Sequence, residues 1–453
     1  MLDRFGGRHT TDSADAVAAL EKAVFAVAAH RPVGTALQDA LAADPDLIAG
    51  HALYGLANVV LARSETLDGA RRVLNEAEAA CARRKEASPT ERALVEALKS
   101  SAAGRMRDAA SSLDRHLTRH PDDFLALKLS HAFHFMSGET DAMLATTERA
   151  LPAWSPANAG YGFVLGCHAF GLEERGHFAI AEKVGRMAYD AEPADAWGLH
   201  AVSHVLEMSH RVGEGADLLE AARPNWTRCN NFSFHMAWHL ALFRLEQGET
   251  DAVLELYDRD IRATPTDDFR DMANAASILW RLELDGVGVG DRWHDLRDIA
   301  FRRRRDMSYV FATLHYLLVL VANRDETGVR DLMTALESQA AGSTGDQSEV
   351  AREIGVPLAR LIESFGSGPA RASDLAAMAE RLPSIGGSHA QRDVFLRTLL
   401  VAADRRGETR DLMTLTRVRH AVRSWDRFMT LLLRRKDGRT RNTLESRQIP
   451  IAS

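Results

Sequence analysis

The sequence predicts an all-α protein built as a solenoid of antiparallel helix pairs, and three observations support this prediction. Nearly every long segment has apolar residues at positions i, i+3, i+4 and i+7, which is the pattern of an amphipathic helix. Runs of alternating β-branched residues, which would indicate strands, are missing. Short hydrophilic breaks such as "SETLDG" and "ATPTDD" separate the helical segments, and their Pro, Gly and Asp residues are typical of helix starts and stops.

The breaks also recur along the chain. A Gly-Glu-Thr turn precedes an amphipathic helix in "MSGETDAMLATTERAL" (136–151), "EQGETDAVLELYDRDI" (246–261) and "RRGETRDLMTLTRVRH" (405–420), and "RDETGVRDLMTALES" (324–338) is a looser copy. Helix pairs with a period of about 34–40 residues are typical of a tetratricopeptide (TPR)-type superhelix, in which each pair buries its apolar face against its neighbours.

We therefore predict a TPR-like helical repeat array over residues 1–338, with the clearest repeats over 121–286. In residues 339–392, stretches rich in Gly, Ser and Pro lengthen the loops. Residues 339–453 are predicted to be C-terminal helices that continue or cap the solenoid.

Composition limits the classes of function. The net charge of −7 is spread along the chain, with basic tracts only at "RRRR" (302–305) and near the C-terminus, which disfavours nucleic-acid binding. No stretch approaches about 18 uninterrupted apolar residues, so no membrane span is expected. The first residues lack the apolar core of a secretory signal. Cys81, Cys167 and Cys229 are widely separated, which favours a cytoplasmic, reduced protein.

Histidines are concentrated in the middle of the chain and recur at the repeat period. Nine of the 18 lie between residues 131 and 239. Intervals of 34, 36 and 35 residues separate the successive histidines His134, His168, His204 and His239. Residues one repeat apart stack as neighbours on one face of a solenoid, and the first helices of its units line the concave surface. We therefore expect these rings to project into one shared groove.

Five residues form the core of the predicted catalytic site. His200, His204 and Glu207 lie at i, i+4 and i+7 and share one helix face. His235 and His239, 35 residues after His200 and His204, form the neighbouring stripe. A single helix histidine is usually structural, but recurrence at the repeat period favours a function for the set.

A second group of residues is predicted to bind substrate around this core. Its members lie at about the same distance from the turn of their own helix pair as the core residues do, but their spacing is less regular. Glu173 has about the same place relative to its turn as Glu207, and His315 the same as His239. Trp238 is weighed both as a packing residue and as a substrate contact. The second group comprises His134, His168, Glu173, Trp238 and His315.

Three kinds of chemistry fit such a cluster. If a metal is present, the imidazoles of His200, His204, His235 and His239 suit zinc or another divalent ion, although neither HExxH nor another named metal motif occurs. Acid–base catalysis is the second, because histidine titrates near neutral pH and a buried glutamate tunes it. Plain ligand binding is the third. No nucleotide cofactor is expected, because phosphate-cradling glycine loops and dinucleotide fingerprints are missing.

The stretch from Trp197 to Asp258 resembles the tetratricopeptide repeat protein 38 family. That family pairs an H-A-x-x-H-x-x-E-M helix with an H-x-x-W-H-x-A-L helix and a G-x-x-x-x-V/A-L-x-x-Y-D continuation. The matching positions are His200, Ala201, His204, Glu207 and Met208, then His235, Trp238, His239, Ala241 and Leu242, then Gly248, Val253, Leu254, Tyr257 and Asp258. One departure is His210, at a turn position where glycine is usual. The resemblance implies a curved α-helical repeat protein and no particular reaction.

Together these observations predict one tightly wrapped superhelix that encloses a His/Glu-lined groove. We expect the groove to bind a small polar molecule or a peptide, with or without acid–base or metal-assisted conversion of it. The alternative is a non-catalytic protein-interaction scaffold whose concave surface grips a partner's tail. The sequence leaves the ligand, the cofactor and the oligomeric state open.

Overall fold

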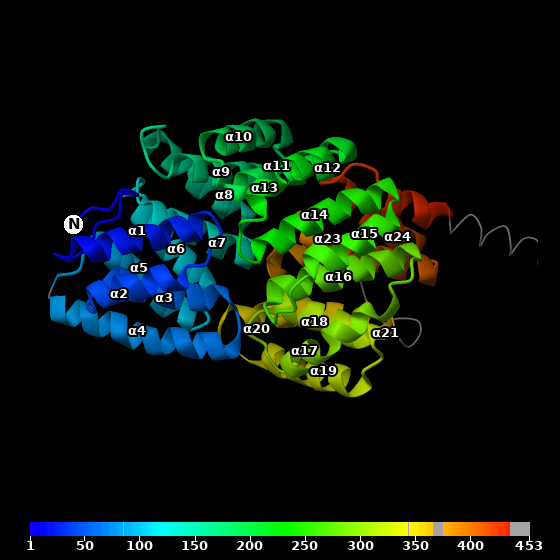
Figure 1. Ribbon diagram of the computed structural model, residues 1–453. Helices are drawn as coiled ribbons and strands as arrows, with labels where there is room; N and C mark the ends of the chain where they lie inside the picture. The colour runs from blue at the N-terminus through cyan, green and yellow to red at the C-terminus, as the bar shows by residue number, and fades with distance from the viewer. Residues whose placement is uncertain (85, 343, 366–374, 435–453) are drawn as a thin grey trace, which may run out of the picture.

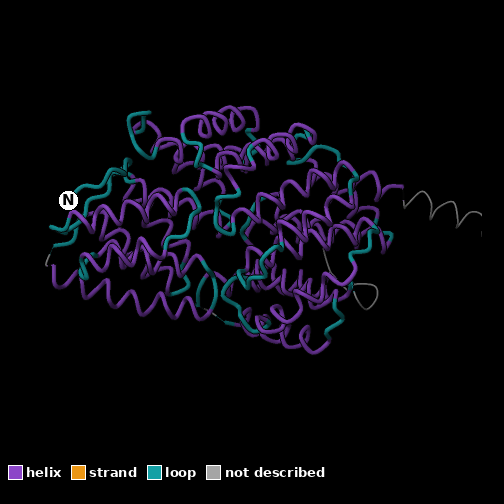
Figure 2. The backbone as a smooth tube through the Cα atoms, viewed as in Figure 1, coloured by secondary structure: helices purple, strands orange, loops and turns teal. Residues whose placement is uncertain are grey.

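A computed structural model describes residues 1–84, 86–342, 344–365 and 375–434, and these residues form an all-helical fold (Figure 1) (Figure 2). No strand occurs within the described ranges, where one isolated bridge joins Leu2 to Arg8. The predicted all-α class is therefore confirmed. Among the described helices, none combines the length and the apolar character that crossing a membrane requires.

The helices follow one another with short connections. The N-terminal helices are α1 (Ala14–Ala28), α2 (Gly34–Ala43), α3 (Ile48–Val60), α4 (Ser64–Arg84), α5 (Pro89–Ala102), α6 (Met106–Leu117), α7 (Phe124–Ser137) and α8 (Thr140–Ala150). The central helices are α9 (Tyr161–Glu174), α10 (Phe178–Ala191), α11 (Ala196–Met208), α12 (Val212–Ala221), α13 (Arg223–Trp226), α14 (Phe232–Gln247), α15 (Thr250–Leu256) and α16 (Phe269–Asp285). The C-terminal helices are α17 (His294–Arg303), α18 (Val310–Ala322), α19 (Glu326–Ala341), α20 (Asp346–Val350), α21 (Val356–Ser364), α22 (Leu375–Arg381), α23 (His389–Arg406) and α24 (Thr409–His420).

The repeated Gly-Glu-Thr turns lie at helix ends, as predicted. Gly138, Gly248 and Gly407 follow α7, α14 and α23 with φ angles of 71°, 80° and 71°. These are left-handed conformations that glycine adopts without a Cβ penalty. After α11, His210 has a φ of 57°. His210, which stands where the quoted family pattern usually has glycine, therefore adopts the same left-handed conformation as the glycines of the other turns.

The helices pack first on their sequence neighbours and then on every second helix. Pairs such as α3 with α4, α5 with α6 and α9 with α10 make extensive contacts. A continuous row runs through α3, α5, α7, α9, α11, α14, α16 and α18, each packed on the next. This row carries all the histidines that the sequence singles out at the repeat period.

The row curls back on itself, because residues far apart in sequence are in contact. The backbone N–H of Asp346 donates to Gly104 O at 2.9 Å, and Arg107 Nη1 lies 2.9 Å from Glu349 Oε2. The backbone N–H of Asn230 donates to His30 O at 2.6 Å. In Figure 1, α20 accordingly lies at the junction between the blue N-terminal helices and the yellow C-terminal ones.

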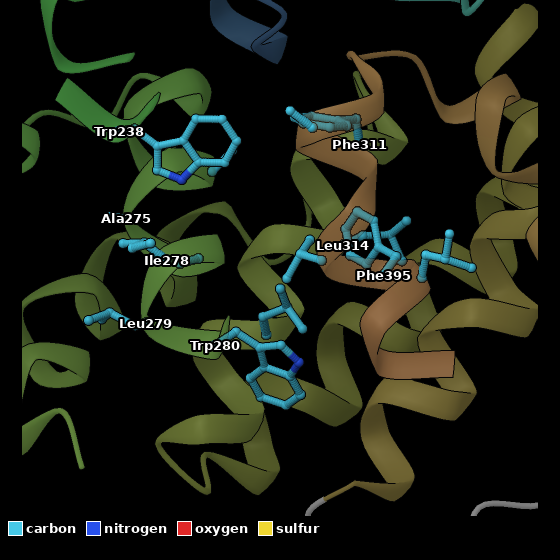
Figure 3. Packing of buried hydrophobic residues seen from close by; sticks show 14 of the residues in the cluster. Trp238, Ala275, Ile278, Leu279, Trp280, Phe311, Leu314 and Phe395 are labelled. Carbon is cyan, nitrogen blue, oxygen red and sulfur yellow. The ribbon is translucent and has the colours of Figure 1, made fainter. Parts of the chain in front are cut away.

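The apolar core has two main parts that meet at α11. One part gathers residues of the N-terminal half and includes Trp197 and Ala201. The other extends through the C-terminal half and includes Leu199 and Val202. Figure 3 shows the second part, where Trp238 of α14 and Ile278 and Trp280 of α16 pack near Phe311 of α18 and Phe395 of α23. Helix α11 is therefore held on two sides by well-packed apolar surface.

The C-terminal part of the chain contains short helices, π-helical residues Ala351–Gly355 and the longer α23, which packs on α16. Of this part, residues 343, 366–374 and 435–453 lie outside the described residues. The predicted division between residues 338 and 339 stays a prediction.

Candidate metal centre

Helices α11 and α14 bring four histidines together in the interior. Each helix presents two of them one turn apart, so His200 and His204 lie opposite His235 and His239. None of the four is more than 8% exposed. The rings converge as the 35-residue interval predicts, but the expected open groove is wrong for them, because the packed helices bury all four rings in the interior. These residues are called the four-histidine cluster below.

The Nε2 atoms of the cluster point at one another. His200 Nε2 lies 3.0 Å from both His204 Nε2 and His235 Nε2, and His239 Nε2 lies 3.2 Å from His235 Nε2. All four rings offer a nitrogen within 4.8 Å of the others. Four nitrogens at about 2.0–2.1 Å from a tetrahedral ion lie about 3.3–3.4 Å apart. The spacing in the cluster is close to that of a four-nitrogen coordination sphere.

The outer Nδ1 atoms face oxygen atoms of the surrounding helices. His204 Nδ1 lies 3.4 Å from Glu173 Oε2 of α9, and His239 Nδ1 lies 3.4 Å from Glu207 Oε2 of α11. His235 Nδ1 lies 2.9 Å from Asn274 Oδ1 of α16. Oxygen partners on the outer nitrogen are the usual arrangement for histidines that ligate a metal, because they fix the tautomer and the ring orientation.

Proton counting shows what the cluster offers a cation. A neutral imidazole carries one N–H. His235 Nδ1 donates to Asn274 Oδ1, so Nε2 of a neutral His235 is a bare lone pair that points into the cluster. The Nδ1 atoms of His204 and His239, each 3.4 Å from a carboxylate oxygen, make no hydrogen bond within the described residues. A positive ion between the rings would take up the inner lone pairs and leave the outer N–H groups facing the carboxylates.

Burial keeps most of the cluster in the form that binds metals. It lowers the pKa of His200 and His235 well below the usual histidine value, and that of His239 to about 4. His204 is the exception, because although burial opposes it, the facing Glu173 carboxylate raises the pKa of His204. Metal ligation by histidine requires the neutral ring, so three of the four rings are in the form that binds a cation at neutral pH.

The two orienting carboxylates have different surroundings. Glu207 Oε1 accepts a hydrogen bond from Arg423 Nη1 at 2.7 Å, and although burial opposes ionisation, Arg423 and His239 hold the pKa of Glu207 well below its usual range. Within the described residues, neither oxygen of Glu173 has a hydrogen-bond partner, and burial raises the pKa of Glu173.

Aromatic rings enclose the cluster. Phe170 packs on His200 and His204, with both pairs of ring centroids 5.4 Å apart. Trp197 lies 4.8 Å from His200 and Trp238 lies 5.2 Å from His235. This shell lowers the local dielectric constant and strengthens any interaction between the cluster and an ion.

Three residues of the predicted substrate-binding group have other partners. His134 is held between Asp114 Oδ2 at 2.9 Å and Glu139 Oε2 at 3.0 Å. His168 Nδ1 pairs with Thr147 Oγ1 at 3.1 Å. His315 is buried against Phe311 and Phe395, and its Nδ1 pairs with the Phe311 carbonyl. Repeat position alone did not bring these three rings to the cluster.

The other two members of that group lie beside the cluster. Glu173 faces His204, as described above. Trp238 is fully buried, stacks on His235 and donates from Nε1 to Ser277 Oγ at 3.0 Å. Trp238 therefore serves as a packing residue of the cluster wall.

Sequence reasoning missed two residues, Asn274 and Arg423. Asn274 lies 35 residues after His239, so extending the same period by one repeat would have found it. Arg423 reaches Glu207 across 216 positions, and nothing near it in the sequence signals that contact.

A scan against models of known protein families gave no match for this chain. The resemblance to the tetratricopeptide repeat protein 38 family therefore stays a prediction from the quoted motif.

Proposed function

We propose that this chain is a TPR-like helical-repeat metalloprotein in which His200, His204, His235 and His239 bind a divalent transition metal ion. One observation carries the proposal: four buried Nε2 atoms converge while three of the outer nitrogens face side-chain oxygens. An all-imidazole donor set suits zinc, copper, iron or nickel, whereas magnesium and calcium prefer oxygen ligands.

We further propose that the ion acts on a small polar molecule rather than on a peptide. The cluster is at most 8% exposed, and a peptide held in an open trough would require exposed rings. A metal ion polarises a bound oxygen atom or generates a nucleophile from water. Four imidazoles complete a tetrahedral sphere, so turnover requires an ion that accepts a fifth ligand.

The TPR-like superhelix and the membership of the tetratricopeptide repeat protein 38 family belong to the same proposal. The row of alternately packed helices, the repeated left-handed glycine turns and the contacts that close the row support the superhelix. The free state of Cys81, Cys167 and Cys229 supports a reducing, cytoplasmic location.

The test is elemental analysis of protein purified without chelators or an affinity tag that binds metal. We expect about one equivalent of an imidazole-preferring ion in the wild type and a stoichiometry near zero in His204→Asn and His239→Asn. His168→Asn is the matched control, because His168 lies on the neighbouring helix and, among the described residues, its side chain pairs with Thr147 alone; it should keep its metal. Metal-free wild-type protein that also fails to bind added zinc, copper, iron or nickel would refute the proposal.

A further inference from the structure

The last residues of α24 and the chain segment after it pack against the ends of three central helices. Residues 419–427, called the clasp segment here, place the backbone N–H of Ser424 2.8 Å from Met208 O at the end of α11. The backbone N–H of Arg427 donates to Glu246 Oε2 of α14 at 2.9 Å, and Arg427 Nη1 lies 2.6 Å from Asp285 Oδ2 of α16. The clasp segment therefore fixes the helices that carry the four-histidine cluster and Asn274.

One side chain of the clasp segment reaches the cluster through a single intermediate. Arg423 Nη1 lies 2.7 Å from Glu207 Oε1, and the other oxygen of the same carboxylate lies 3.4 Å from His239 Nδ1. The side chains of Arg423 and Glu207 are 4% and 3% exposed. Glu207 thus joins a guanidinium on one side to a ring of the cluster on the other.

The charges around Arg423 are balanced within the protein. Its Nε lies 3.0 Å from Asp426 Oδ2, and its Nη2 lies 3.8 Å from Glu246 Oε1. Asp426 in turn pairs with Arg419 Nη2 at 2.5 Å. A buried charge loses its hydration and persists only when it is paired and hydrogen-bonded, so this network keeps Arg423 in place beside Glu207.

A fixed Glu207 has a direct effect on a metal ligand. A carboxylate on the outer nitrogen holds the imidazole in the orientation and tautomer that the metal requires and makes the inner nitrogen more basic. Without Arg423, the Glu207 side chain would lose the hydrogen bond that fixes it and would be free to rotate away from the ring. The quality of His239 as a ligand therefore depends on a residue 216 positions from Glu207.

We propose that Arg423 is a positioning residue of the metal centre, and that the clasp segment affects the metal affinity through this one contact with Glu207. This inference rests on the proposed function. The geometry places its effect on one half of the centre, because Glu173, which faces His204, receives no such hydrogen bond from the described residues. Any event that separates Arg423 from Glu207 would weaken metal binding by loosening His239 and leave the histidines themselves unchanged.

The experiment compares full-length wild type, Arg423→Met, Arg423→Lys and Arg427→Met by competition against a chromophoric zinc chelator. Arg427→Met is the matched control, because it breaks a half-buried ion pair of the same segment that does not involve Glu207. We expect a 10- to 100-fold weaker zinc affinity for Arg423→Met, an intermediate loss for Arg423→Lys, and a change of less than threefold for Arg427→Met. The cobalt(II) form of Arg423→Met should also have an altered visible spectrum.

Circular dichroism and thermal unfolding of each metal-free variant separate ligand positioning from loss of fold. If Arg423→Met does not fold, the zinc affinity of Arg423→Lys tests the inference instead, because lysine retains a positive charge and lacks the planar donor group. Folded Arg423 variants with wild-type affinity and cobalt spectrum would overturn the inference while leaving the metal centre intact. An equal loss in Arg427→Met would also overturn it. Wild-type protein that binds neither zinc nor cobalt would overturn the metal centre and this inference together.

Discussion

Replacement of His239 by asparagine tests the metal centre through thermal stability. His239 is fully buried, its Nε2 faces the other rings and its Nδ1 faces Glu207. The substitution removes one of four metal ligands, so it should abolish most of the stabilisation that metal gives to the folded state.

The size of the effect follows from mass action. A ligand at 1,000 times its dissociation constant stabilises the folded state by about 4 kcal/mol. With an unfolding entropy of about 2.1 cal/mol/K per residue, a 453-residue chain that unfolds cooperatively gains about 4 °C in Tm from that ion. The gain should shrink to below about 1 °C in His239→Asn, because a site with three ligands binds far more weakly.

Differential scanning calorimetry of chelator-treated protein, with and without added zinc, measures this difference. His168→Asn is the control and should keep the full metal-dependent gain. An equal gain in wild type and His239→Asn would refute the reasoning, because the ion would then bind elsewhere. A wild type whose Tm does not respond to any imidazole-preferring ion would refute it as well.

Three further predictions test other parts of the structure. Glu173→Gln should weaken zinc binding 10- to 100-fold by chelator competition, since a neutral amide orients the facing ring less strongly than a carboxylate; an unchanged affinity would contradict the role given to this residue. Although burial opposes it, the hydrogen bonds that His134 donates to Asp114 and Glu139 raise the pKa of His134 to about 9, so its contribution of up to about 3 kcal/mol is complete below pH 6.5 and is lost as pH rises through 9. Urea unfolding at pH 7 and pH 10 should therefore show a larger drop in wild type than in His134→Asn, and parallel drops would count against it. Gly138→Ala should cost about 2–4 kcal/mol, because its Cβ would meet a backbone carbonyl of the 382–385 turn, whereas Gly407→Ala, at the same φ in open space, should cost about 1 kcal/mol in the same assay.

The helical class and the four-histidine cluster could be predicted from the sequence because both depend on period. A helix repeats every 3.6 residues and the histidine pairs recur after 35, so a stack of helix pairs with that period predicts that His200 and His235 lie side by side, as they do. The same logic, extended by one repeat, reaches Asn274. The period is a property of neighbouring helices, and it needs no knowledge of the rest of the fold.

The remaining features depend on rotation and on closure, which the period does not determine. His134, His168 and His315 lie on helices of the same row, but small changes in how each helix is rotated turn their rings toward Asp114, Thr147 and Phe311. The contact of Arg423 with Glu207 forms because the C-terminal part of the chain packs against the central helices. The sequence around each of the two residues gives no sign of such a long-range contact.

The contacts that close the row of helices also change how the protein can come apart. An open array can lose its end helices one at a time, because each unit is held only by its neighbours. Here backbone hydrogen bonds join Gly104 to Asp346 and His30 to Asn230. The helices beside these residues therefore cannot open without breaking hydrogen bonds to a distant part of the chain. Local opening of helices α1 to α6 should therefore be rare, and amide hydrogen exchange there should approach the rate set by global unfolding.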